Sequence, residues 1–81
     1  MTDDPLRGPD EILEDFARQY GVRVSDLTSN RQYQHLSTPR GMVAWELRYQ
    51  NGWSLSAIGE LLGGRHHSSV IHLLNKLEED R

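Results

Sequence analysis

Residues 54–77 hold two short apolar repeats at helical spacing, and this stretch constrains the fold more than any other part of the chain. Ser54 is placed to cap the first repeat, because its hydroxyl can accept a hydrogen bond from a free backbone N–H. Gly63-Gly64 ends that repeat, since glycine adopts the left-handed conformation that closes many helices. A second helix should begin between Arg65 and Ser68, which predicts a helix-turn-helix. The expected buried positions are Leu55, Ile58, Leu61 and Leu62 in the first helix and Val70, Leu73, Leu74 and Leu77 in the second.

Two longer helices and one short turn are expected upstream. The first helix runs from Pro9 to Gly21, because proline suits the first helical position and glycine the end. Ser25 should cap a single turn over residues 26–29. Thr38-Pro39 starts a further helix that reaches about Gln50. The predicted fold is therefore all-α, a small multi-helix bundle, with residues 1–8 as a flexible leader, residues 9–81 as one domain and residues 30–37 as its longest loop.

The charge of the chain is unevenly distributed. The 81 residues carry a net charge of −3, which by itself disfavours a nucleic-acid partner. Residues 1–26 have seven acidic and three basic side chains, whereas residues 27–76 have two acidic and five basic ones and all four histidines. A basic face can therefore exist on this acidic protein. The chain has no cysteine and no apolar run of membrane length, so we expect a cytoplasmic protein without membrane contact.

Part of this stretch resembles a known signature. Ile58-Gly59 followed by residues 63–70, Gly-Gly-Arg-His-His-Ser-Ser-Val, resembles the C-terminal DNA-binding domain of the bacterial replication initiator DnaA, usually I-G and then G-G-R-D-H-T-T-V. The resemblance extends upstream through Leu27, Ser29, Arg31 and Pro39-Arg40, and covers roughly residues 10–79. It implies a TrpR-like helix-turn-helix that binds double-stranded DNA, with the second helix in the major groove and the first helix and its flanks on phosphates.

The resemblance also implies roles for particular residues. His67, Ser68 and Ser69 match positions that touch base edges or nearby phosphates. Arg40 and Arg48 match phosphate-contacting positions, and the minor-groove arginine of the family falls at Gln32, with Arg31 beside it. The full set of expected DNA-contacting residues is Arg31, Gln32, Arg40, Arg48, Leu55, Ser56, Arg65, His66, His67, Ser68, Ser69, His72 and Lys76.

His66 stands where the signature has an aspartate that accepts a hydrogen bond from cytosine. A neutral histidine can accept or donate, and a charged one can only donate. Guanine or a phosphate therefore becomes a better partner than cytosine, and a surface histidine without a role is the remaining alternative.

Other classes of function are disfavoured. The histidines lack the spacing and the cysteine or carboxylate neighbours of a metal site, and no serine has the partners of a catalytic triad, so neither a cofactor nor an enzyme activity is expected. The leading hypothesis is sequence-preferring DNA binding in replication initiation or its regulation, or in the control of a phage or mobile element. Two alternatives stay open. One is a protein-interaction module that docks a partner on the acidic first helix, and the other is a transposition-associated DNA-binding domain.

Overall fold

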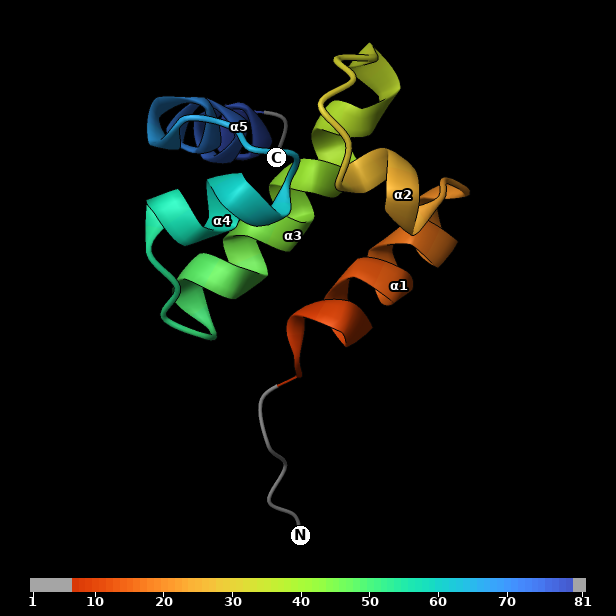
Figure 1. The fold of residues 1–81 in the computed structure, drawn as a ribbon, viewed down its shortest axis with the longest axis horizontal. Coiled ribbons are helices and arrows are strands. Elements are labelled where there is room, and N and C mark those ends of the chain that lie inside the picture. The colour runs from red at the N-terminus through yellow and green to blue at the C-terminus, as the bar shows by residue number, and fades with distance from the viewer. Residues whose placement is uncertain (1–6, 80–81) are drawn as a thin grey trace, which may run out of the picture.

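Five α-helices and one short 3-10 helix make up residues 7–79, the part of the chain that the computed structural model describes (Figure 1). In chain order they are α1 (Pro9–Tyr20), α2 (Val24–Leu27), η1 (Gln34–Leu36), α3 (Ser37–Tyr49), α4 (Leu55–Leu61) and α5 (His67–Glu79). Within these residues there is no strand, which confirms the predicted all-α fold. None of these helices is long and apolar enough to cross a membrane.

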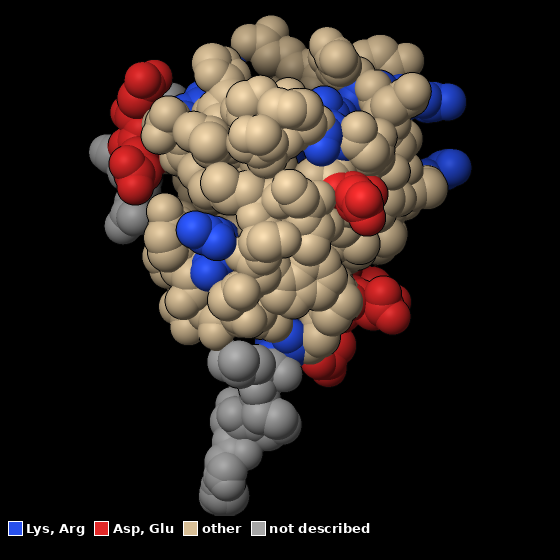
Figure 2. Space-filling view, turned by 60° about the vertical axis from the view of Figure 1, so that its left-hand side comes forward, with Lys and Arg blue, Asp and Glu red and all other residues tan. Residues whose placement is uncertain are grey.

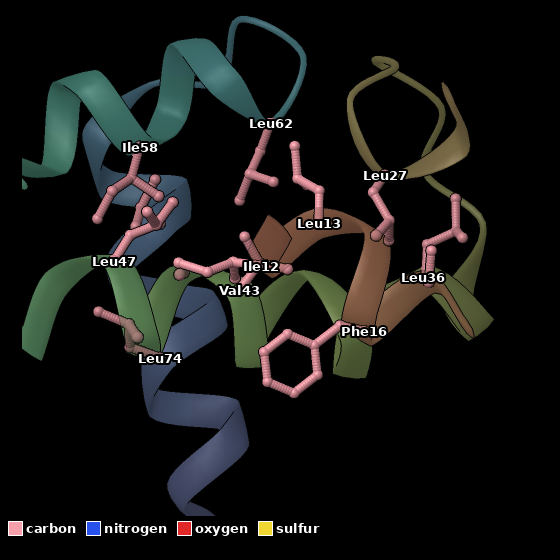
Figure 3. Close-up of a cluster of buried hydrophobic side chains, with 13 residues drawn as sticks. Ile12, Leu13, Phe16, Leu27, Leu36, Val43, Leu47, Ile58, Leu62 and Leu74 are labelled. Carbon is pink, nitrogen blue, oxygen red and sulfur yellow. The ribbon is translucent and has the colours of Figure 1, made fainter. Parts of the chain in front are cut away.

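The central helix α3 joins the two halves of the bundle. It contacts α1 on one side and both α4 and α5 on the other (Figure 1). Figure 3 shows side chains from both halves meeting over α3, and Ile12 and Leu13 of α1 belong to the same cluster as Leu62, the residue that follows α4. Most side chains in this cluster are fully buried, among them Ile12, Leu27, Leu36, Val43, Leu47, Ile58, Leu62 and Val70. Burial of this apolar surface drives folding, since a chain of this size has no room for a second core.

Arg7 ties the start of the described chain to α3. Its guanidinium makes a bidentate contact with the Glu46 carboxylate, at 2.6 and 2.9 Å, and donates to Asp15 at 2.7 Å. The Asn51 side-chain amide donates to the Arg7 carbonyl at 2.7 Å. The hydrogen bond from Arg7 lowers the pKa of Asp15, and the two carboxylates together raise the pKa of Arg7. Of the predicted leader, residues 1–6 lie outside the described residues, whereas Arg7 and the helix cap Gly8 belong to the fold.

Two predicted helix starts are wrong by one or two residues. The short helix α2 begins at Val24, and Ser25 lies inside it, because the Asp26 carboxylate reaches back to the Arg23 N–H at 3.4 Å and supplies the cap. Helix α3 begins at Ser37 and not at Pro39 with Thr38 as its cap, because η1 runs directly into it. Pro39 still lies in the first turn, where a helix does not need its N–H.

The helix-turn-helix forms as predicted. The Ser54 hydroxyl accepts from the Ala57 N–H at 3.1 Å and caps α4, and the Arg65 N–H donates to the Gly59 carbonyl at 2.8 Å across the turn. A Cβ at Gly59 would overlap the Arg65 carbonyl, so only glycine fits where the turn crosses α4. Gly63 has a φ of +97°, and a Cβ there would overlap the Ser29 carbonyl of the neighbouring loop.

We predict that Gly63→Ala destabilises the domain by about 3 kcal/mol or more, because it combines a left-handed backbone with a collision. Gly64→Ala is the matched control, since its φ is +76° but no atom lies within 4 Å of its Cβ. It should cost only about 1 kcal/mol. Urea denaturation followed by far-UV circular dichroism measures both changes, and equal losses would contradict the close approach to Ser29.

Candidate nucleic-acid interface

The residues expected to contact DNA do not share one environment. Most of them lie on the surface around the start of α5 and the loop before η1, whereas Arg40 is buried. The exposed members are Arg31, Gln32, Arg48, Ser56, His66, His67, Ser68, Ser69 and His72, and the half-buried ones are Leu55, Arg65 and Lys76. The surface therefore holds the predicted set with one exception.

An open hollow of about 450 Å³ separates the loop before η1 from α5. Gln32 and Tyr33 line it on the loop side, and Ser68, Ser69 and His72 line it on the helix side. Arg65 also borders the hollow, and none of its lining residues is acidic. A loop and a helix that are more than 30 residues apart in sequence thus line two sides of one polar space without acidic residues.

Arg40 also borders this hollow, but it is almost entirely buried, which disfavours its expected role at phosphates. Its side chain is only 3% exposed, and the guanidinium donates to the backbone carbonyls of Asp26, Leu27, Ser29 and Arg31 at 2.6–3.1 Å. Two of these carbonyls lie at the end of α2, where a helix leaves its last carbonyls without partners. Burial lowers the pKa of Arg40 to about 10, and repulsion from Arg65 adds to this effect. The side chain remains a cation at neutral pH and holds residues 26–31 in place.

Arg65 joins the same loop to the helix-turn-helix. Its Nε donates to the Leu62 carbonyl at 2.8 Å, and its NH2 group donates to the Arg31 carbonyl at 2.9 Å. That carbonyl is the one that Arg40 also binds, so two guanidinium groups converge on it. Burial lowers the pKa of Arg65. Because these contacts use the backbone of Arg31, its exposed side chain stays available beside the hollow.

Arg48 lies on the exposed end of α3, next to the start of α4. Within residues 7–79 its side chain makes one hydrogen bond, to the Trp53 carbonyl at 3.0 Å. Of the two arginines expected at phosphates, Arg40 and Arg48, only Arg48 is at the surface. Figure 2 shows the face that carries α4 and α5, where basic groups are scattered over a largely uncharged surface and acidic groups lie mainly toward its margins.

His66 closes the turn and caps α5. Its Nδ1 accepts from the Ser68 backbone N–H at 3.2 Å and lies 2.8 Å from the Ser68 hydroxyl. The imidazole also packs against that of His67, with ring centroids 4.1 Å apart. Within residues 7–79 no group of three or more histidine, aspartate or glutamate side chains could hold a metal ion.

Tyr33 is a surface residue that the sequence reasoning did not select. It is 54% exposed, borders the hollow and stacks on His35, with ring centroids 5.8 Å apart and planes within 13°. Its signal in the sequence is an aromatic residue in an otherwise polar loop. Stacked aromatic rings at a surface offer a flat face for a base or a sugar.

Comparison with known proteins agrees with this geometry. Residues 9–77 match the family described as the bacterial DnaA protein helix-turn-helix. The chain belongs to the bacterial DnaA helix-turn-helix family. Over 71 residues it is 35% identical to the chromosomal replication initiator protein DnaA of Herpetosiphon aurantiacus, which is 88% of this chain and 15% of that protein. No solved structure gives a significant match.

The DnaA family signature divides into two kinds of position in this structure. Ile58, Gly59 and Val70 are buried, and Arg65 is tied to backbone carbonyls, so these residues form the turn. The four residues between Arg65 and Val70 are exposed, and they present two imidazoles and two hydroxyls at the start of α5. The second group is the part of the DnaA-like signature that solvent or a ligand can reach.

We predict that Arg40→Met lowers the stability of the domain much more than Arg48→Met does. Arg40→Met should cost about 3 kcal/mol or more of folding free energy, because the Leu27 and Ser29 carbonyls lose their donor. The Asp26 and Arg31 carbonyls each lose one of their donors. Arg48→Met should cost less than about 1 kcal/mol, since that side chain is exposed. Urea denaturation tests both variants. An Arg40→Met protein as stable as the parent would show that this guanidinium does not hold the loop.

Proposed function

We propose that this chain binds double-stranded DNA with a sequence preference, through the N-terminal half of α5 and the loop that carries Arg31. The observation that carries the proposal is the hollow between them, which has hydrogen-bonding groups on both sides and no acidic lining residue. With α5 in the major groove, the loop would meet the adjoining phosphate strand and reach toward the minor groove. Hydroxyl and imidazole groups on α5 would then face base edges.

The dimensions of α5 suit this role. Its 13 residues span about 20 Å, and the major groove, about 12 Å wide, admits an α-helix. Val70 and Leu74 anchor α5 to the core, so its opposite side is left for the groove. Ser56, in the first turn of α4, borders a hollow together with His66 and His67 and so lies beside this face.

The net negative charge does not contradict the proposal, because the acidic groups of α1 and α3 lie elsewhere. Only Glu60 of α4 and Glu79 of α5, among the described acidic residues, border hollows on the α4–α5 side. Asp15 of α1 and Glu46 of α3 form ion pairs with Arg7, on the α1 side of α3. Asp10, Glu11 and Glu14 of α1 are exposed, and they would support the alternative of a protein-docking surface. Since α4 and α5 lie on the other side of α3, both surfaces could be occupied at once.

The name of the relative supports a biological setting for the proposed activity. That protein is a chromosomal replication initiator, and this chain spans only 15% of its length. We therefore place the proposed DNA binding in replication initiation or its regulation, at the bacterial nucleoid. The activities of the longer relative outside the matched region are not attributed to this chain.

Duplex DNA binding should weaken steeply with salt. Arg31, Arg48, Arg65 and Lys76 lie on or beside the proposed face, and each neutralised phosphate contributes about −0.9 to the slope of log K against log salt. A slope of about −3 to −4 is expected in fluorescence anisotropy titrations of labelled duplexes. No binding at low salt would exclude the DNA proposal and leave protein docking on α1 as the better account.

Affinity and discrimination should respond to different side chains. Arg48→Ala should weaken binding to all duplexes by a similar factor, because a phosphate contact carries no sequence information. Ser69→Ala should reduce the preference for the selected site over a scrambled one by roughly 5-fold or more, since its hydroxyl lies on the helix that faces the bases. Competition titrations with both duplexes measure the two effects. A uniform loss for both variants would mean that α5 does not enter the major groove.

A further inference from the structure

The imidazole of His66 is held in one orientation by the start of α5. His66 is the residue immediately before the first helical residue. Its Nδ1 accepts a hydrogen bond from the backbone N–H of Ser68, the second residue of the helix. The first N–H groups of a helix have no partner within it, so an acceptor at this position stabilises the helix. A histidine here thus does the work that aspartate, asparagine or serine does at most helix starts.

These contacts determine which ring nitrogen carries the hydrogen. A backbone N–H can only donate, so Nδ1 of His66 must be the acceptor and carry no hydrogen. The Ser68 hydroxyl, 2.8 Å away, must then donate to the same nitrogen. In a neutral imidazole the other nitrogen bears the hydrogen. Nε2 of His66 is therefore a hydrogen-bond donor.

The Nε2–H donor of His66 lies on the ring edge away from the hydrogen bond that joins Nδ1 to α5. The two ring nitrogens lie on either side of Cε1, so the edge with Nε2 is turned from the amide that holds Nδ1. His66 is exposed and packs on the ring of His67, which limits rotation of its own ring. It borders a second hollow, between α4 and α5, together with Ser56, Glu60 and Arg65. No hydrogen bond joins Glu60 to His66 in the described residues, so Nε2–H is left for an external acceptor.

We propose that His66 is a specificity-determining residue that reads guanine through a donor of fixed position and polarity. This inference rests on the proposed DNA binding. In the major groove guanine presents two adjacent acceptors, N7 and O6, whereas cytosine presents an amino group that would oppose the N–H of His66. Adenine offers a single acceptor next to an amino group. The order of preference at the contacted position is guanine first and cytosine last.

Two substitutions separate the polarity of the side chain from its capping role. Aspartate and asparagine both accept well at a helix start, so His66→Asp and His66→Asn should retain the cap. His66→Asn still presents an N–H donor outward, whereas His66→Asp presents only acceptors. Comparison of the two variants therefore changes the outward group at residue 66 from a hydrogen-bond donor to an acceptor without removing the helix cap.

The test selects sites from a randomised duplex pool with the intact chain and with both variants. At one position the parent and His66→Asn should select guanine and His66→Asp should select cytosine, with the other positions unchanged. Anisotropy titrations should then give a guanine-to-cytosine preference of roughly 5- to 20-fold for the parent, reversed in His66→Asp. The same base from all three proteins would overturn the inference, as would a uniform loss of affinity in His66→Asp, which would indicate a phosphate contact.

A second readout needs no DNA. Long-range proton–nitrogen correlation spectra of the free protein distinguish the two histidine tautomers, and His66 should carry its hydrogen on Nε2. A hydrogen on Nδ1 would overturn the inference even if the chain binds DNA. A parent protein that enriches no site from the pool would instead overturn the proposed function, and this inference with it.

Discussion

The buried guanidinium of Arg40 is the contact on which the geometry of the proposed interface depends. A cation inside a small bundle is costly unless its N–H groups are satisfied, and here backbone carbonyls satisfy them without any carboxylate in contact. Those carbonyls belong to the end of α2 and to the loop that follows. Because Arg65 donates to the Arg31 carbonyl as well, the loop is fixed both to α3 and to the helix-turn-helix. The two sides of the hollow are thereby held at a constant separation.

The turn between α4 and α5 also contacts this loop at Gly63. Gly63 passes the Ser29 carbonyl so closely that no side chain fits, and Ser29 is also one of the residues that Arg40 binds. The sharp turn and the loop are therefore parts of one packed unit. A substitution of Gly63 or of Arg40 should therefore alter the angle between the loop and α5, and not merely the local backbone.

Periodicity and capping rules predicted the fold well and the site only in part. The bounds of α4 and the start of α5 follow from Ser54 and the two glycines, which act through neighbours in sequence. The inward position of Arg40 could not be predicted, because it depends on carbonyls 9–14 residues away that only the folded chain brings together. The cap by His66 was missed for a different reason. Histidine is not among the residues preferred at helix starts, so its type gives no signal for that role.

The distribution of arginines limits how this chain can recognise DNA. Arg7 is occupied by two carboxylates and Arg40 by carbonyls, and Arg65 gives part of its donor capacity to the backbone. Few cations are then left to attract phosphates, on a chain whose net charge is −3. Nonspecific affinity should therefore be low, since it derives almost entirely from phosphate neutralisation. Discrimination between sites must come from the uncharged groups at the start of α5, where the hydrogen-bonding polarity of each side chain decides which base it accepts.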